Sequence, residues 1–515
     1  MLSNLNHFIQ YLVPFKITTS IFLITIISML IIIWVIKFYV KVYKYPKGPF
    51  PLPFIGNLLQ LLPFDAMPDK FEYYKKIYGP IFTIFIPYPV VVLCDYESFK
   101  EALVKNSSIL NGRQKGYPES FVHPETGRGL VFADGPYWKE QRKVCFQIFR
   151  NFGVGRSLME SKIMDYVNET LNYVEKKRKD GPIDFTWIYK ACFANIMCEL
   201  LFGIKRSLED DQEIKFIMEP LEKVFELGRS GISLIYHFFN NNPWIIKILK
   251  KINNIGRAEL EIAFKHMNSI IIEAKSTWVK GKEPKNFVHA YMEKTNSDDE
   301  YINEVEMPFV VHDVWVAGME TTATTLNWAM NILGTFTEKQ EKFRKEIHDV
   351  IGYDTTIHYD DRERLPYCQA VVYEILRFSN ILPHNITHRT EKDVIIGGKL
   401  IPNDTIVFAQ QYNIMKYDPI FYESNKFIPE RFLMEDEKTY RKEAVDRMLA
   451  FSAGSRKCIG ENMALMQIFL FLTNLLSRYE IKAPKGGPMP SLSGKWAGII
   501  KAPSFAFDVV KVRTK

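Results

Sequence analysis

The chain has 515 residues, of which 47% are hydrophobic and 14% aromatic, so it is long enough to bury a large apolar core. Its net charge is +7 without a long lysine- and arginine-rich block, which argues against nucleic-acid binding and favours an anionic membrane or an acidic protein partner. The six cysteines form no CxxC pair, which excludes a zinc knuckle and a disulfide-rich scaffold.

The first predicted element is an uncharged apolar segment, ITTSIFLITIISMLIIIWVI, over residues 17–36. At about 1.5 Å rise per residue, roughly 20 residues cross the hydrocarbon core of a bilayer. Lysines are more frequent just after this segment, between Lys37 and Lys47, than before it, where only Lys16 lies close. The positive-inside rule therefore predicts a short lumenal tail over 1–16, a transmembrane anchor over 17–36 and a cytosolic remainder.

A basic, proline-rich hinge over 37–53 is predicted next. Its second half, YPKGPFPLP (45–53), holds four prolines, which cannot continue a helix and favour a stiff extended segment. We expect it to be a spacer that keeps the body, residues 54–515, close to the membrane.

The body is predicted to be mainly α with small β-sheets, because amphipathic patterns of helical period dominate it. These patterns cover residues 66–78, 96–106, 135–151, 156–178, 184–203, 209–228, 254–280, 301–338, 339–352, 362–379 and 461–478. Two β-branched runs, Ile81–Ile86 and Val90–Leu93, predict a hairpin, and 394–401 with Thr405–Phe408 predicts a second small sheet. Neither βαβ alternation nor a GxGxxG motif occurs, so a dinucleotide-binding half is not expected.

The stretch FSAGSRKCIG (451–460) places one cysteine, Cys458, beside Arg456 and Lys457, just before a predicted helix. Cations and a helix N-terminus lower the pKa of a thiol, and two flanking glycines, Gly454 and Gly460, leave room for a large flat group. In isolation this cysteine would be interpreted as an ordinary core residue, as the other five are. The flanking residues instead favour a thiolate site with a bulky neighbour.

This stretch resembles the haem loop of the cytochrome P-450 family at every defined position, F-x-x-G-x-R-x-C-x-G. Further stretches resemble motifs of the same family in the same order: Trp138–Arg142, Ala317–Thr322, Glu374–Arg377 and Pro429–Phe432. With its anchor and hinge, the chain resembles the microsomal animal form from about residue 17 to its end. The resemblance implies the cytochrome P-450 fold, with a haem-binding catalytic domain over 54–515 after the transmembrane helix.

The resemblance also implies the cofactor, haem b (iron protoporphyrin IX) with an axial cysteine thiolate. Cys458 is then the axial ligand of the metal, and Arg456 faces a haem propionate. Phe451 packs beside the thiolate, and Gly460 belongs to the cofactor-binding loop. A thiolate ligand donates electron density to iron and favours cleavage of the O–O bond.

Buried propionates need hydrogen-bond donors. Trp138 and Arg142 lie one helical turn apart, so the indole N–H and the guanidinium share a face of one helix. By resemblance they bind the propionates together with His388. The adjacent Arg389 remains an alternative to His388.

The motif Ala317–Thr322 resembles the distal helix on which the family binds oxygen. Ala317 and Gly318 are cofactor-binding by resemblance, since a glycine lets dioxygen approach the backbone. Glu320 and Thr321 form an acid–alcohol pair that can relay protons, which predicts catalytic roles for both. A tight helix contact is the alternative explanation of the glycine.

The pair Glu374 and Arg377 lies in an apolar helix, where an ion pair must be buried and fully satisfied. With Arg431 it is interpreted as structural support for the haem loop. An apolar substrate pocket is expected to be lined by three residues of the distal helix, Val310, Trp315 and Ala317. Further lining is expected from the segments 113–132, Phe225–Tyr236, Ile381–Ile386 and Trp496–Ile499. Residues 228–249 are expected to dip into the membrane.

These features predict a haem-thiolate monooxygenase that inserts one oxygen atom from dioxygen into a lipophilic steroid, fatty acid or xenobiotic. NADPH supplies electrons through a flavoprotein, NADPH–cytochrome P-450 reductase, which is expected to dock on Lys139, Lys143 and Lys457. The alternatives are an isomerase or dehydratase on the same fold and a non-catalytic haem-binding sensor. The expected location is the endoplasmic reticulum membrane, with a single span, a cytosolic catalytic domain, contacts to membrane lipid and none to nucleic acid.

Overall fold

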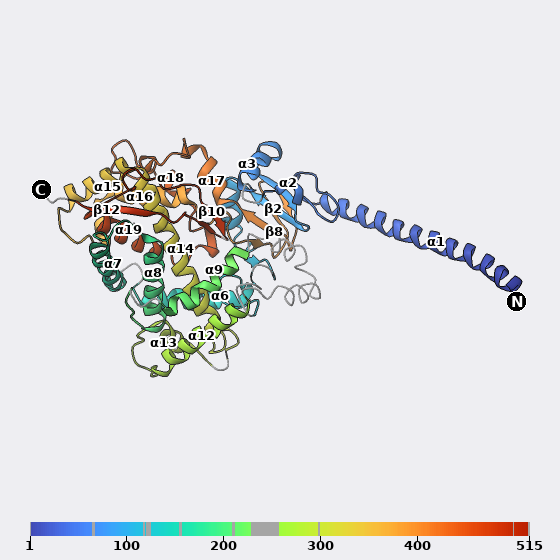
Figure 1. Ribbon diagram of the computed structural model, residues 1–515, viewed down its shortest axis with the longest axis horizontal. Coiled ribbons are helices and arrows are strands. Elements are labelled where there is room, and N and C mark those ends of the chain that lie inside the picture. Colours follow the sequence, from blue (N-terminus) through green and yellow to red (C-terminus); the bar gives the residue numbers. More distant parts are fainter. Residues whose placement is uncertain are drawn as a thin grey trace.

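One long N-terminal helix, α1 (Leu2–Val42), projects from a body built mostly of helices, and the C-terminus lies at the opposite end (Figure 1). The computed structural model describes residues 2–63, 67–116, 119, 125–153, 157–208, 212–227, 257–296, 299–497 and 499–512. The mainly α architecture with small sheets agrees with the sequence analysis.

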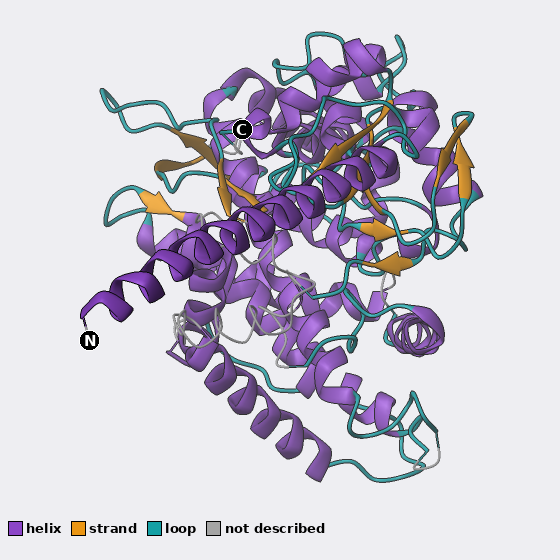
Figure 2. Ribbon diagram, turned by 90° about the vertical axis from the view of Figure 1, so that its right-hand side faces the viewer, coloured by secondary structure: helices purple, strands orange, loops and turns teal. Residues whose placement is uncertain are grey.

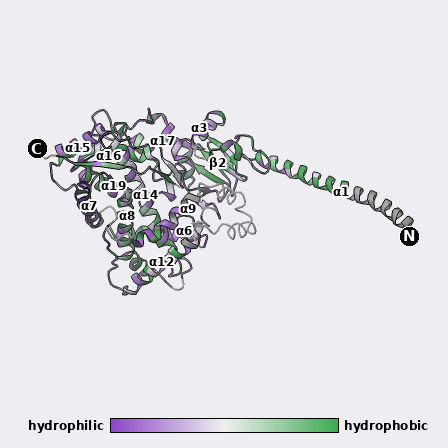
Figure 3. Ribbon diagram, viewed as in Figure 1, coloured by the Kyte–Doolittle hydropathy of each residue, from purple (hydrophilic) through white to green (hydrophobic). Residues whose placement is uncertain are grey.

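Helix α1 runs past both predicted limits of the membrane span. Its stretch Ile21–Val42 is long and apolar enough to cross a membrane (Figure 3), and most of its side chains are exposed. No glycine or proline interrupts residues 37–42, so the first part of the predicted hinge is helical. Helix α8 (Phe185–Phe202) passes the same test of length and composition, but it is mostly buried and belongs to the core.

The proline-rich segment is packed against the body and is not a free spacer. A Cβ atom on Gly48 would lie 1.9 Å from the carbonyl oxygen of Thr83 in β1 (Ile81–Phe85), so only glycine allows this approach. Asn57 Nδ2 donates a hydrogen bond of 2.9 Å to Pro49 O, and Asn57 Oδ1 accepts one of 2.7 Å from Phe85 N.

Aromatic rings join α1 to the body at this point. Trp34 stacks on Phe54 with ring centroids 4.0 Å apart, and Tyr39 stacks on Phe50 at 5.2 Å. Phe38 of α1 makes an edge-to-face contact with Phe85 of β1. We call these contacts the aromatic joint, and its members are Trp34, Phe38, Tyr39, Phe50, Phe54 and Phe85.

The central helix is α14 (Met307–Thr335), which packs against α8, α16 (Pro366–Ser379) and α19 (Glu461–Leu476). Helices α8 and α19 are apolar nearly all round, as expected of helices that protein surrounds. The remaining α-helices enclose this centre: α2 (Leu58–Leu61), α3 (Met67–Tyr78), α4 (Tyr96–Lys100), α6 (Gly135–Asn151), α7 (Ser157–Lys177), α9 (Gln212–Leu227), α12 (Arg257–Ser276), α13 (Phe287–Met292), α15 (Thr337–Val350), α17 (Gln411–Tyr417) and α18 (Lys442–Asp446).

Most predicted helices are confirmed to within a few residues, and α6 has the predicted bounds. The predicted helix 96–106 is instead two elements, because α4 continues as a π-helix over Glu101–Lys105. The predicted helix 301–338 begins later, at Met307, where Pro308 occupies the first turn and a proline is tolerated.

The predicted hairpin of β1 with β2 (Pro89–Leu93) is confirmed. The second predicted sheet is wrong in its pairing, because β8 (Ile406–Ala409) joins β2 in parallel. Segment 394–401 forms its own hairpin of β6 (Val394–Ile396) and β7 (Lys399–Ile401). β8 belongs to a five-stranded sheet of order β1-β2-β8-β5-β3.

The other strands form small sheets on the body (Figure 2). In the five-stranded sheet, β5 (His388–Arg389) and β3 (Gly112–Arg113) are antiparallel neighbours, so their side chains meet. The remaining strands are β4 (Ile183–Asp184), β9 (Tyr479–Lys482), β10 (Lys495–Ala497), β11 (Ile499–Lys501) and β12 (Ala506–Lys511). Strands β10 and β11 form a hairpin whose second strand ends beside α14, as described below.

Candidate active site

Cys458 is set in a tight loop before α19. Its backbone N–H donates a hydrogen bond of 2.9 Å to Phe451 O, which fixes the loop just upstream of Gly460, the residue that caps α19. The side chain of Cys458 is exposed, whereas the other five cysteines are buried. Protein atoms nevertheless lie close enough to the thiol to desolvate it.

The flanking charges do not by themselves make this thiol a thiolate. Burial raises the pKa of Cys458 above its ordinary value, and this outweighs the opposing effects of the Gly460 N–H, Arg142 and Lys457. Lys457 also pairs with Glu461 at 2.5 Å, which compensates its charge. A metal ion that the sulfur coordinates would deprotonate it outright, so the thiolate form requires the metal.

The two glycines of the loop have different explanations. A Cβ on Gly454, which has a φ of +75°, would lie 1.6 Å from Leu103 O of the π-helix, so contact with protein accounts for this glycine. The predicted role of Gly454, which is to make room for a large flat group, is therefore not needed to explain this glycine. At Gly460 a Cβ would meet only Cys458 Sγ, at 4.0 Å, so the space beside this residue is open.

The middle of α14 is accessible although the helix crosses the core. From Phe309 to Leu326 every residue of α14 is buried except four, which are Val316, Ala317, Gly318 and Thr321. Ala317 is the most open of them. Since α14 packs against α8, α16 and α19, this accessible stretch indicates a hollow that reaches the central helix.

Gly318 and Thr321 make local contacts in this stretch. A Cβ on Gly318 would lie 2.6 Å from Met197 Sδ of α8, so close packing of the two helices accounts for this glycine. The Thr321 hydroxyl donates a hydrogen bond of 2.7 Å to Ala317 O, one turn earlier. No hydrogen bond joins the described side chains of Glu320 and Thr321, and the carboxylate of Glu320 instead pairs with Lys501 Nζ at 2.7 Å.

Arg456 and Trp138 are in direct contact. The guanidinium carbon lies 3.5 Å from the centroid of the Trp138 ring, and the guanidinium donates hydrogen bonds to Asn111 O and Ala133 O. Its Nη1 atom is buried and has no partner among the described residues. Burial lowers the pKa of Arg456 to about 7. From the same helix as Trp138, Arg142 donates to Lys457 O and reaches the cysteine loop.

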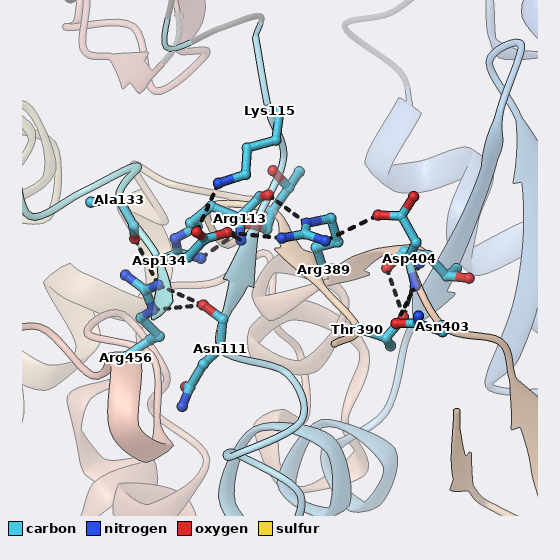
Figure 4. A network of polar contacts seen from close by, with 12 residues as sticks. Asn111, Arg113, Lys115, Ala133, Asp134, Arg389, Thr390, Asn403, Asp404 and Arg456 are labelled. Atoms are coloured by element: carbon cyan, nitrogen blue, oxygen red, sulfur yellow. Dashed lines mark hydrogen bonds and ion pairs between the residues drawn. The ribbon is translucent and has the colours of Figure 1, made fainter. Parts of the chain in front are cut away.

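His388 and Arg389 have different partners in the structure, and Figure 4 shows those of Arg389. The guanidinium of Arg389 is occupied, at 2.9 Å from Asp134 Oδ2 and 3.0 Å from Asp404 Oδ1. His388 is 1% exposed and its Nδ1 donates to Leu110 O at 2.6 Å, while its buried Nε2 has no partner among the described residues. His388 therefore has a free hydrogen-bonding position inside the protein.

Sequence reasoning did not identify Arg113, which lies opposite His388 in the sheet. It is 4% exposed and donates to Val131 O at 3.0 Å and to Ile386 O at 2.9 Å (Figure 4). Burial, together with Arg142, lowers its pKa to about 9. No motif or periodicity marks this arginine, because its burial depends on the pairing of β3 with β5.

Arg113, Arg456 and His388 are buried basic groups with the half-buried Arg142 beside them, and we call these four the buried basic cluster. Arg113 lowers the pKa of both Arg456 and His388. Asp134 is one anion near them, but it also holds Lys115 and Arg389. A group that carries two carboxylates would relieve this repulsion and fill the unpaired positions. Together with the accessible thiol and the open face of α14, the cluster fits haem, whose two propionates are such carboxylates.

The predicted ionic triad is buried as expected. Glu374 is 0% exposed and accepts hydrogen bonds of 2.7 Å from Arg377 Nε, 3.1 Å from Arg431 Nε and 2.9 Å from Ile428 N. Arg377 also donates to Met415 O at 2.9 Å. The triad thus joins α16 to the PERF turn, residues Pro429–Phe432, upstream of the cysteine loop.

The predicted substrate pocket needs correction on α14. Val310 and Trp315 are fully buried in the core, so of the three residues named there only Ala317 faces the hollow. Five of the six residues of the predicted lining segment Ile381–Ile386 are partly accessible, and only Pro383 is buried. The side chain of Trp496 and residues 228–249, which are predicted to dip into the membrane, lie outside the described part of the chain.

Comparisons with known proteins show the family to which the chain belongs. Residues 46–507 match the family described as Cytochrome P450. The chain is similar to "Cytochrome P450 2H1" of Gallus gallus, with 33% identity over 86% of this chain and 88% of the relative. It is also similar to "Cytochrome P450 2D27" of Mesocricetus auratus (31% identity, 88% and 90% covered) and to "Cytochrome P450 2B2" of Rattus norvegicus (31%, 89% and 92%).

Proposed function

Because the chain belongs to the cytochrome P450 family and is therefore a haem-thiolate monooxygenase, we propose that it inserts one oxygen atom from dioxygen into a lipophilic organic substrate. Electrons come from NADPH through a flavoprotein reductase. The observation that carries the proposal is the accessible thiol of Cys458 near a basic cluster in which Arg456 Nη1 and His388 Nε2 have no partner among the described residues. A cysteine of the hydrophobic core would need neither access to solvent nor neighbouring basic groups.

In this proposal Cys458 is the axial ligand of the haem iron. The residues that bind the propionates have side chains that donate hydrogen bonds and lie in or beside the buried basic cluster. They are Arg113, Trp138, Arg142, His388 and Arg456. Ala317 and Gly318 of α14, with Phe451 and Gly460 of the cysteine loop, are proposed to border the haem site. His388 is preferred to Arg389 because its Nε2 is unpaired, whereas Arg389 is occupied by two aspartates.

Haem bound at Cys458 supplies the oxygen-activating chemistry. The chain supplies proton delivery, and Glu320 with Thr321 is proposed as its relay. The Thr321 hydroxyl lies on the accessible face of α14, and its oxygen can accept a second hydrogen bond while it donates to Ala317 O. Glu320 is the preceding residue, turned by about 100° around the helix axis, and its carboxylate pairs with Lys501 Nζ at 2.7 Å.

The ligand assignment is tested with Cys458→Ala and the less disruptive Cys458→Ser. Both variants should lose the Soret band that marks thiolate ligation in the reduced carbonyl complex, because the sulfur that sets that band is gone. Circular dichroism checks that the fold persists. A variant that keeps the thiolate-type band would show that another residue is the ligand.

Two alternatives on the same fold are separable in one assay. An isomerase or dehydratase would convert substrate without NADPH or dioxygen, and a haem-binding sensor would convert nothing. Product that depends on both NADPH and dioxygen supports the monooxygenase. A spectral titration with steroids, fatty acids and drug-like compounds then identifies the substrate class, which the apolar residues Ala317 and Ile381 beside the hollow suggest is lipophilic.

The reductase is proposed to dock on one face of α6. Lys139, Lys143, Phe146 and Arg150 are exposed and recur at intervals of three and four residues, so they share a face that we call the basic face. Phe146 is 57% exposed, and an exposed aromatic ring within a charged rim is typical of a docking site. Arg142, on the neighbouring side of α6, reaches the cysteine loop, so this face lies near the proposed haem.

The location is proposed to be the endoplasmic reticulum membrane, with α1 as the single span and the body on the cytosolic side. Support comes from the apolar exposed stretch Ile21–Val42 and from the lysines that follow residue 36. Protease protection in sealed microsomes tests the orientation, since a cytosolic body should be digested without detergent.

A further inference from the structure

A row of alternating charges runs from α8 to the central helix α14. Lys501, the last residue of β11, lies between two carboxylates, with Nζ 2.7 Å from Glu320 Oε1 and 3.9 Å from Glu222 Oε1. Glu222 of α9 pairs in turn with Lys190 of α8. The exposed fraction of the side chains rises from 5% at Glu320 to 26% at Lys501 and 35% at Glu222, so the row leads from a buried acid towards solvent.

The backbone beside Lys501 is firmly held. The N–H of Ile500 donates a hydrogen bond of 2.7 Å to Ile381 O, and the carbonyl of Ile500 accepts one of 2.9 Å from Trp328 Nε1 of α14. A Cβ on Gly494 would lie 2.3 Å from the Ile500 side chain, which shows how closely the hairpin is packed. Lys501 is therefore presented to α14 from a fixed position.

Glu320 depends on this lysine for its charge balance. Both carboxyl oxygens are buried without a hydrogen-bond partner among the described residues, because the angles at the 2.7 Å contact are those of an ion pair and not of a hydrogen bond. A buried carboxylate without a cation is strongly disfavoured and would take up a proton. The ammonium group thus stabilises the ionised form and leaves the oxygen lone pairs available to water or a hydroxyl.

We propose that Lys501 is a positioning residue for Glu320, whose carboxyl it keeps ionised and fixed beside the accessible face of α14 so that the acid can take protons from the solvent side. This inference rests on the proposed relay of Glu320 and Thr321. When a proton from a hydronium ion reaches Glu320, an O–H bond forms on the carboxyl and one breaks in the hydronium. The carboxyl O–H bond then breaks as the proton passes through a bridging water to the Thr321 oxygen, which releases its own hydroxyl hydrogen to the oxygen substrate. Glu320 is then a carboxylate again, and the ammonium of Lys501 keeps its three hydrogens throughout.

The test compares full-length variants in lipid. Lys501→Met removes the ammonium and keeps the apolar stem, whereas Lys501→Arg keeps the charge. Lys482→Met in β9 is the matched control, because Lys482 is also a partly exposed lysine of the C-terminal strands and pairs with Glu480 at 3.1 Å. Glu320→Gln and its double mutant with Lys501→Met complete the set.

The first readout is the infrared absorption of protonated carboxyl groups. Near neutral pH, Lys501→Met should show an added carboxylic-acid band that is absent from the wild type, Lys501→Arg and Lys482→Met. The band should disappear when Glu320→Gln is added. The second readout is product formed per NADPH, which should fall about three- to tenfold in Lys501→Met, part of the effect of removing a catalytic acid. Lys501→Arg should restore most of it.

The outcomes separate this inference from the proposed function. If Glu320→Gln leaves product per NADPH unchanged, the relay itself is wrong. If Glu320→Gln lowers that ratio while Lys501→Met shows neither the band nor the loss, the relay stands and the role of Lys501 is wrong. A loss of product without the band would also overturn it, because it would indicate a damaged hairpin.

Discussion

The two residues of β5, His388 and Arg389, have different partners. The structure therefore distinguishes their roles, which the sequence left open. His388 faces the buried basic cluster with a free Nε2, whereas Arg389 faces Asp134 and Asp404. For His388 to donate to a propionate from Nε2, its ring must carry both hydrogens, because Nδ1 already donates to Leu110 O. Burial and the neighbouring arginines lower the pKa of His388 well below its ordinary value, so a bound anion is needed to hold the charged ring.

We expect His388→Phe to release haem about 10- to 100-fold faster than the wild type, since a charge-assisted hydrogen bond contributes about 1.5–3 kcal/mol. Transfer of haem to an excess of apomyoglobin measures the rate. Arg389→Gln is the control, and it should lower the thermal midpoint through Asp134 while changing haem release less than about threefold. Equal release rates in the two variants would contradict the assignment.

The hydroxyl of Thr321 gives the second prediction at this scale. Thr321→Ala should keep a normal haem content, because Thr321 donates only to a backbone carbonyl of its own helix. It should lower product per NADPH at least tenfold and release hydrogen peroxide instead, as expected when a proton relay is broken. Thr325→Ala, one turn further along α14 and bonded to Thr321 O at 2.9 Å, is the control. Unchanged coupling in Thr321→Ala would exclude it as a relay.

The sequence predicted the chemical roles of single residues better than it predicted the environment of those residues in the fold. The motif around Cys458 identified the accessible cysteine among six, but it did not reveal that burial would raise the pKa of the thiol. Arg113 and Lys501 were missed because each acquires its role from a partner far away in the chain, on β5 and α14 respectively. Such partners are set by tertiary packing and leave no local pattern.

At the scale of elements, the triad Glu374–Arg377–Arg431 ties α16 to the turn before the cysteine loop. Glu374→Ala should destabilise the fold by about 3–5 kcal/mol, because two buried guanidinium groups lose their anion. Thermal unfolding and haem content measure the effect.

The matched control for this prediction is Glu430→Ala in the same turn. The Glu430 side chain is 27% exposed and pairs with Lys339 and Lys342 near the surface, so the variant should lose at most about 1 kcal/mol. Similar losses in the two variants would mean that burial of the triad is not what stabilises this junction.

Helices were predicted more accurately than sheets, for a physical reason. The bounds of α6 and α16 follow from local periodicity and from prolines in the first turn. The pairing of β8 with β2 joins strands more than 300 residues apart, which no local pattern encodes. The π-helix after α4 was missed as well, because it is set by contact of Leu103 O with Gly454 of the cysteine loop.

At the scale of the whole molecule, the basic face of α6 makes a prediction about electron delivery. Lys139→Glu with Lys143→Glu should slow reductase-driven turnover about tenfold at low salt, and less at 1 M salt, where the Debye length is about 3 Å. Turnover driven by peroxide bypasses the reductase and should change little. Lys75→Glu with Lys76→Glu, on the last turn of α3, is the control of equal charge. Equal losses in both assays would indicate damage near Arg142 instead of weaker docking.

The aromatic joint has a consequence for how the membrane acts on the enzyme. At about 1.5 Å per residue, the 41 residues of α1 are roughly 60 Å long, twice the hydrocarbon thickness of a bilayer. A thicker bilayer stands such a helix more upright and a thinner one tilts it. Because stacked rings couple α1 to the body, a change in the tilt of the helix should reorient the body. The distance and the orientation of the basic face of α6 relative to the membrane surface should then change. If α1 spans the membrane as proposed, the rate of electron transfer from the proposed reductase should therefore depend on lipid composition.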